Sequence, residues 1–186
     1  MKSWIERIYY RLKGHSSLYQ YYAAVHYSTC ETCLQKHGQI LHSSDGAPPL
    51  HDGCRCWLLE FSLSELDAHK QKAIRMHQKA QRELLRRALF QRACESWSTD
   101  PIKASELFKG AAEIDLYLEE VEVFCQTHKA SIAKSPESAA KLRDILIRAY
   151  KLKFEKEKYK PMPERMKATW QQVGIERLEE LFTRER

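Results

Sequence analysis

The last two thirds of the chain, after residue 62, carry apolar residues at helical spacing. Three of the runs begin at residues that favour a helix start, namely Ser62 with Glu65, Asp100 before Pro101, and Ser135 before another proline. A proline-containing stretch at 160–163 separates the last two runs. The pattern predicts four helices, at about 63–97, 101–125, 136–154 and 164–183. We expect them to form a bundle or an extended helical arm.

The first 62 residues follow different patterns. A short amphipathic helix is predicted over residues 3–12. Aromatic and small residues alternate over 18–27, which favours a strand, with a helix as the alternative. The apolar run 57–61 predicts a second strand that pairs with the first. Between them, the segment 30–56 is rich in cysteine and turn-forming residues, so we expect a loop-rich knuckle there.

These patterns predict an α+β fold that is mostly α. Residues 1–62 would form the N-terminal helix and a small β knuckle around the cysteine-rich segment, and residues 63–186 a helical domain. A chain of 186 residues, 43% of them hydrophobic, is long enough for one or two domains with a core. Since no run of 18 apolar residues occurs, we expect no membrane span. The clustering of the cysteines indicates a reducing, cytoplasmic compartment.

The charges are unevenly distributed along the chain. The net charge is +6, but residues 69–92 hold eight basic side chains and a single acidic one. Residues 105–122 reverse this, with six acidic side chains against one lysine. The basic stretch is either a nucleic-acid-binding surface or a solvated helix face paired with the acidic stretch. The candidate nucleic-acid-binding residues are Lys79, Arg82, Arg86 and Arg87.

Four of the six cysteines form a C-x-x-C pair and a C-x-C pair with twenty residues between them. They are Cys30, Cys33, Cys54 and Cys56. Two thiol pairs that meet across a loop suit tetrahedral zinc, Zn²⁺. The C-x-C pair needs a sharp turn, which Gly53 favours, and His51 is an alternative ligand to one of its two cysteines.

Free buried thiols or two local disulfides would also account for these cysteines, but their clustering favours zinc. A hydrolytic zinc site keeps an open coordination position and has a carboxylate base nearby. The acidic residues near the cluster are Glu31, Asp45 and Asp52. Because four protein ligands close the coordination sphere, we expect a structural zinc rather than a catalytic one.

The cysteine segment also resembles a known family. Its matching parts are Cys30-Glu-Thr-Cys33, His37-Gly38 and Pro48-Pro49-Leu50-His51-Asp52-Gly53-Cys54-Arg55-Cys56. These are similar to the motif of the phage Mu F-like head morphogenesis proteins, also described as minor head or minor capsid proteins, which usually have proline where Asp52 stands. The resemblance covers about residues 18–62. It implies a zinc module, a phage portal or head protein or packaged DNA as partner, and a place in the virion or the host cytoplasm.

The sequence therefore predicts a non-enzymatic structural or assembly protein, and it permits an oligomer. G-x-S-x-G, Walker-type, H-E-x-x-H and dinucleotide motifs are absent from it. One alternative is a zinc-containing nucleic-acid-binding protein that uses the basic helix 69–92. A metal-dependent hydrolase is a further alternative, and an open coordination position would distinguish it.

Overall fold

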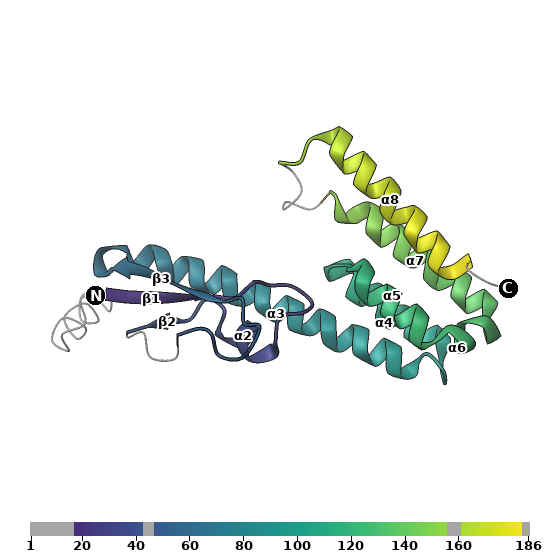
Figure 1. Ribbon diagram of the computed structural model, residues 1–186, viewed down its shortest axis with the longest axis horizontal. Helices are drawn as coiled ribbons and strands as arrows, with labels where there is room; N and C mark the ends of the chain where they lie inside the picture. Colours follow the sequence, from purple (N-terminus) through teal and green to yellow (C-terminus); the bar gives the residue numbers. More distant parts are fainter. Residues whose placement is uncertain (1–16, 43–46, 156–160, 184–186) are drawn as a thin grey trace. The chain divides into compact units, whose positions relative to one another are not determined.

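A computed structural model of the protein describes residues 17–42, 47–155 and 161–183. The chain divides after Leu84 into two compact units, called here unit 1 and unit 2. The division falls within the long helix α3 (Leu66–Ser96), which contributes to both units (Figure 1). The sequence pattern instead predicts a boundary between residues 62 and 63, just before this helix. The N-terminal helix predicted over residues 3–12 lies outside the described residues.

Unit 1 contains a three-stranded antiparallel sheet. Its strands are β1 (Ser17–Tyr22), β2 (Ile40–Leu41) and β3 (Trp57–Ser62), in the order β2-β1-β3. The pairing of β1 with β3 sets Tyr22 opposite Trp57. Both predicted strands are confirmed, although the first ends at Tyr22 rather than at residue 27. The short helix α2 (Glu31–Lys36), inside the predicted knuckle, is not indicated by the sequence pattern.

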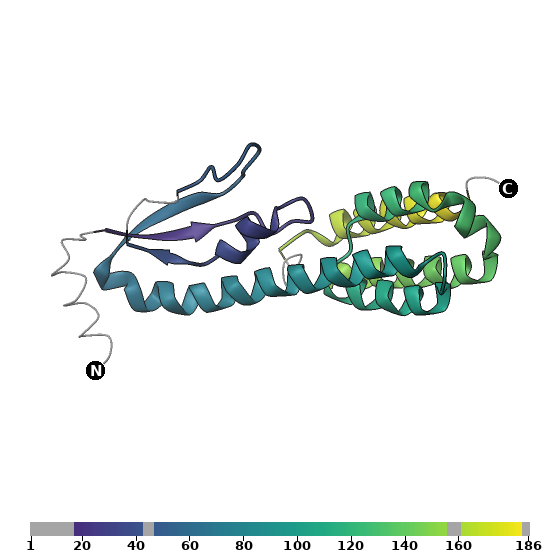
Figure 2. The same cartoon turned by 90° about the horizontal axis from the view of Figure 1, so that it is seen from below.

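Alternate side chains of β1 enter two separate small cores. On the side of α3, Leu18 packs with Phe61 and Leu66. On the opposite side, Tyr21 packs around Cys33, and the other cysteines of the knuckle border this cluster. A strand exposes successive side chains to opposite faces, so β1 links the helix to the cysteine segment. Figure 2 shows the strands beside the first part of α3.

Gly38 allows the knuckle to approach α3 closely. Its φ angle is +93°, a conformation that side-chain-bearing residues rarely adopt. A Cβ atom at this position would lie 2.9 Å from the carbonyl oxygen of Ala73 in α3. The Gly38 N–H donates to the Tyr21 carbonyl at 2.8 Å. The helix thus supports the backbone that leads from α2 to β2.

Unit 2 is a helical bundle that contains the last part of α3. Its other helices are α4 (Pro101–Ile114), α5 (Leu118–Thr127), α6 (Lys129–Lys134), α7 (Pro136–Lys153) and α8 (Glu164–Thr183). Helix α7 packs against both α4 and α8, and α5 also packs against α8. Trp97, Phe108 and Phe124 meet edge to face in the core, with ring centroids 4.6 to 6.4 Å apart.

The predicted helix starts are confirmed. A 3₁₀ turn (Leu63–Glu65) precedes α3, and the Ser62 N–H donates to the Glu65 carboxylate at 2.9 Å. Asp100 caps α4 by accepting from the Lys103 N–H at 3.0 Å. The helices predicted at 63–97, 136–154 and 164–183 are present, and the mostly α, α+β class is confirmed.

The single helix predicted over residues 101–125 is wrong, because the chain breaks between α4 and α5. Asp115 is extended, with φ −162° and ψ 158°. Its carboxylate accepts from the Leu116 N–H at 3.0 Å, and Lys153 of α7 donates to the Leu116 carbonyl at 2.5 Å. The adjacent Asp115 carboxylate and a lysine distant in sequence therefore hold backbone groups that a continuous helix would use, and these contacts override the local helical pattern.

Candidate metal centre

Helix α2 positions the first cysteine pair. Cys30 is the N-cap of this helix, and its sulfur accepts from the Cys33 N–H at 3.3 Å. Cys33 lies within the first turn and is buried against Tyr21, whose hydroxyl donates to its sulfur at 3.7 Å. The C-x-x-C spacing combined with one helical turn therefore directs both sulfurs to the same side.

A tight turn before β3 positions the second pair. The Cys54 N–H donates to the His51 carbonyl at 3.1 Å, and Gly53 within this turn has a φ angle of +74°. This is the sharp turn that the sequence predicts from the glycine. Cys56 immediately precedes Trp57, the first residue of β3. The second pair is thereby anchored to the edge strand of the sheet.

His51 presents one ring nitrogen to the cysteines and the other to the backbone. Its Nε2 lies 3.0 Å from the Cys30 sulfur and 3.3 Å from the Cys33 sulfur. Its Nδ1 lies 2.8 Å from the Asp52 carbonyl oxygen, which can only accept, so Nδ1 is the donor. In the neutral ring Nε2 then carries the lone pair, as in metal-binding histidines whose other nitrogen is held by a carbonyl.

The donor atoms form two overlapping groups that share Cys33. Cys30, Cys33 and His51 make one group, and Cys33, Cys54 and Cys56 make the other, with all donor atoms in each within 4.8 Å of one another. Zinc–sulfur bonds of about 2.3 Å at tetrahedral angles place two sulfurs roughly 3.8 Å apart. The Cys33 and Cys54 sulfurs are 3.7 Å apart. The spacing of this pair fits a shared tetrahedral ion.

The surroundings favour the thiolate form of two cysteines. The pKa of Cys54 is lowered to about 6, chiefly because a backbone hydrogen bond at Leu50 stabilises the thiolate. Desolvation is the largest single effect on Cys30 and acts against its ionisation, but the hydrogen bonds from the Cys33 N–H and side chain and the interaction with His51 together outweigh it, so the pKa of Cys30 is lowered. Burial raises the pKa of Cys33. A bound cation would favour ionisation of that thiol too, because the metal binds the thiolate and the proton is released to solvent.

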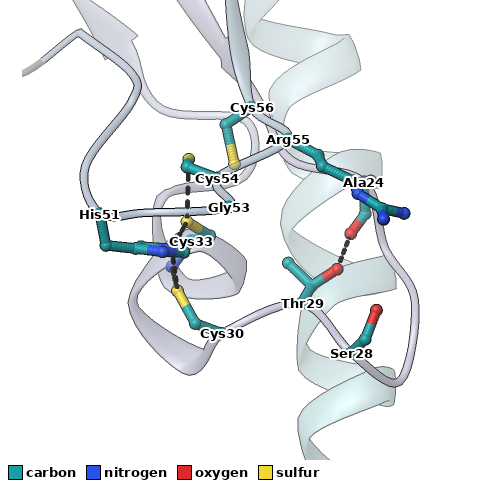
Figure 3. Close-up of a pocket in the computed structure, with 10 residues that line it drawn as sticks. All are labelled: Ala24, Ser28, Thr29, Cys30, Cys33, His51, Gly53, Cys54, Arg55 and Cys56. Carbon is teal, nitrogen blue, oxygen red and sulfur yellow. Dashed lines mark hydrogen bonds between the residues drawn. The ribbon is translucent and has the colours of Figure 1, made fainter.

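The cluster borders a small cavity of about 190 Å³, shown in Figure 3. Ten residues line it, and none of them is an aspartate or glutamate. The lining polar groups are the candidate ligands, the hydroxyls of Ser28 and Thr29, and the guanidinium of Arg55. Arg55 lies between the two cysteines of the second pair in sequence, but its guanidinium points away from the four sulfurs (Figure 3).

The structure brings together all five candidate ligands that the sequence indicates, including both His51 and Cys56. The sequence pattern does not indicate Tyr21, whose hydroxyl contacts the Cys33 sulfur. A strand-forming tyrosine gives no local sign of this role, which depends on α2 folding under β1. His37, also in the family-like motif, is buried elsewhere, where its Nδ1 accepts from the Ala23 N–H at 3.0 Å.

The proposed nucleic-acid-binding residues do not form one exposed set. Lys79 and Arg82 are exposed in unit 1, and Arg87 is half-buried in unit 2. Arg86 is a correction to the prediction, because it is buried and donates from both terminal nitrogens to the Glu120 carboxylate, at 2.6 and 3.2 Å. Arg86 of the basic stretch thus pairs with Glu120 of the acidic stretch, as the alternative interpretation of the basic stretch expects.

Within the described residues, no helix is both long and apolar enough to cross a bilayer. The sequence matches no protein-family model, and neither a curated protein nor a solved structure matches the chain. The resemblance to phage head morphogenesis proteins therefore stays a prediction that rests on the motif of residues 30–56.

Proposed function

We propose that the protein is a non-enzymatic binding protein in which one structural zinc ion fixes unit 1 as a rigid recognition module. The observation that carries this proposal is the convergence of four sulfurs and one imidazole nitrogen on two groups that share Cys33. Sulfur and imidazole donors in tetrahedral geometry are typical of zinc. Zinc would hold together the start of α2, the turn at His51–Cys54 and the start of β3, which bury little apolar surface of their own.

A structural role suits this donor set better than hydrolysis. Five protein donors are available for an ion that takes four, so protein atoms alone complete the coordination sphere. A hydrolytic site would need a water position and a carboxylate base, and among the described residues those that line the adjacent cavity include no carboxylate; Asp45 lies outside the described residues. An assembly role in a phage head, with a portal or head protein as partner, is a narrower proposal supported by the motif alone.

Metal removal tests the structural role. The purified full chain would be treated with a chelator, and backbone hydrogen exchange would be followed by mass spectrometry. We expect peptides from 17–62 to lose protection, while peptides from α4 and α7 keep theirs, because only unit 1 depends on the ion. Added zinc should restore protection and added magnesium should not. Unchanged exchange over 17–62 would contradict the proposal.

Single substitutions identify the four ligands. Cys33→Ser should abolish zinc binding, since Cys33 belongs to both groups. His51 and Cys56 are alternative donors for the fourth coordination position. If His51→Ala retains zinc, His51 lies outside the coordination sphere, and if Cys56→Ser retains zinc, Cys56 does. Cys125→Ser is the matched control, because this cysteine is buried in unit 2.

A further inference from the structure

An aromatic pair made of an exposed tryptophan on the edge strand β3 and a half-buried tyrosine on β1 lies in unit 1. Trp57 and Tyr22, opposite each other on β3 and β1, stack with ring centroids 5.4 Å apart and an interplanar angle of 13°. Trp57 is 52% exposed, and Leu59 on the same face of β3 is 41% exposed. Tyr22 covers one face of the indole ring, which leaves half of this large side chain open to a ligand.

A basic groove adjoins the aromatic pair. Lys72, Arg75 and Lys79 of α3 line it, together with Ala68 and Met76. The three cations are exposed, and their spacing of three and four residues places them on one face of the helix. The Lys72 Nζ also lies 5.1 Å from the centre of the Tyr22 ring. The groove and the aromatic pair therefore form one continuous surface.

The cysteine cluster of the candidate metal centre adjoins both the Trp57 ring and the Tyr22 ring in sequence. Cys56 directly precedes Trp57, and Tyr21, which directly precedes Tyr22, donates to the Cys33 sulfur. Glu60, the acidic residue of β3, belongs to the opposite face of the strand. The surface thus combines an aromatic stack, whose strands are fixed by the cysteine cluster, with the positive charges of α3 on the same side of the sheet.

We propose that this surface, formed by Tyr22, Trp57, Lys72, Arg75 and Lys79, binds single-stranded nucleic acid. A base stacks on the open part of Trp57, and the phosphates run along the three cations. Every base offers a π face, so such a site is tolerant of sequence, and paired bases in a duplex do not offer that face. The proposal deepens the function above, because it names the ligand that the zinc-held module recognises.

Binding would be measured by fluorescence anisotropy with the zinc-loaded full chain and a labelled oligothymidylate of about eight nucleotides. We expect Trp57→Ala to weaken binding roughly 10- to 100-fold, and Trp57→Phe to retain most of it, since the loss is that of one base–aromatic stack. Trp170→Ala is the matched control, because this tryptophan is 59% exposed on α8 in unit 2. A duplex of the same length should bind more weakly than the single strand.

The salt dependence tests the phosphate contacts. Three cations on a single strand give a slope of log affinity against log salt of about −2. The triple variant Lys72→Ala, Arg75→Ala, Lys79→Ala should remove most of this slope. A triple variant of exposed cations in unit 2, Lys103→Ala, Lys109→Ala, Arg148→Ala, makes the same change in net charge and should leave the slope intact.

Three results would overturn the proposal. The first is that the oligothymidylate does not bind at low salt, and the second is that Trp57→Ala leaves its affinity unchanged. The third is that the two triple variants lose the same part of the salt slope. Binding of an acidic, proline-rich peptide that depends on Trp57, without binding of the oligonucleotide, would instead make the surface a peptide site. Zinc content measured on the same samples separates the two proposals, since a zinc-loaded protein that fails to bind refutes this one alone.

Discussion

Replacement of Glu120 by alanine tests the buried ion pair that ties the end of α3 to α5. The Arg86 side chain is 1% exposed and that of Glu120 is 16% exposed. Both terminal nitrogens of the guanidinium donate to this carboxylate, and the guanidinium also lies 4.7 Å from the centre of the Tyr117 ring. The pair is therefore a bidentate one in a desolvated site.

Removal of one partner from such a pair costs about 3 to 5 kcal/mol, because the remaining charge stays buried. Since Glu120 keeps some contact with solvent, we expect Glu120→Ala to lower the free energy of unfolding of unit 2 by about 3 kcal/mol. The measurement is urea unfolding of the full chain followed by circular dichroism at 222 nm, a helix signal, and by tryptophan fluorescence. Trp97 in the unit 2 core contributes to the fluorescence change.

Glu119→Ala is the matched control for this measurement. It removes the same charge from the neighbouring position of α5, where the side chain is exposed, and should change the free energy of unfolding by less than about 0.5 kcal/mol. If the two variants were equally stable, the buried pair would not stabilise unit 2 as reasoned. In the oligothymidylate assay, Glu120→Ala should not strengthen binding, because Arg86 is not part of the proposed surface.

Three further predictions concern single side chains. Gly174→Ala should destabilise unit 2 by about 1 to 2 kcal/mol in urea unfolding, because its Cβ would overlap the buried Tyr150 ring, whereas Gly110→Ala should be neutral or stabilising. Burial lowers the pKa of His37 to about 4, so unit 1 should lose up to about 3 kcal/mol as the pH falls from 6.5 to 4, and His37→Gln should lessen that loss in unfolding measured at both pH values. Tyr21→Phe should weaken zinc binding roughly 10- to 100-fold in chelator competition, and Tyr19→Phe should not.

The parts of the fold that local chemistry encodes are predictable from the sequence. Ser62 with Glu65, Asp100, and the proline after Ser135 indicate the starts of three helices, because each of these local devices acts within one turn. Alternation indicates the first of the two long strands, and a short apolar run indicates the second. The spacing of the cysteines, with Gly53 and His51, indicates the five donor atoms that the structure brings together.

The features that the sequence does not reveal depend on contacts between residues distant in sequence. The break at Asp115 is held by Lys153, which lies on a different helix. The burial of Arg86 depends on α5 folding against α3, and its place in a run of basic residues suggests the opposite. Trp57 belongs to an apolar run that predicts a strand, and its exposure follows from the position of β3 at the sheet edge, which the run alone does not specify.

The most direct test of the central claim is the zinc content of the purified full chain, measured by elemental mass spectrometry without exposure to chelators. We predict about one zinc ion per chain in the wild type and in Cys125→Ser, and almost none in Cys33→Ser. A wild-type protein without zinc, or a Cys33→Ser variant that retains as much zinc as the wild type, would contradict the account.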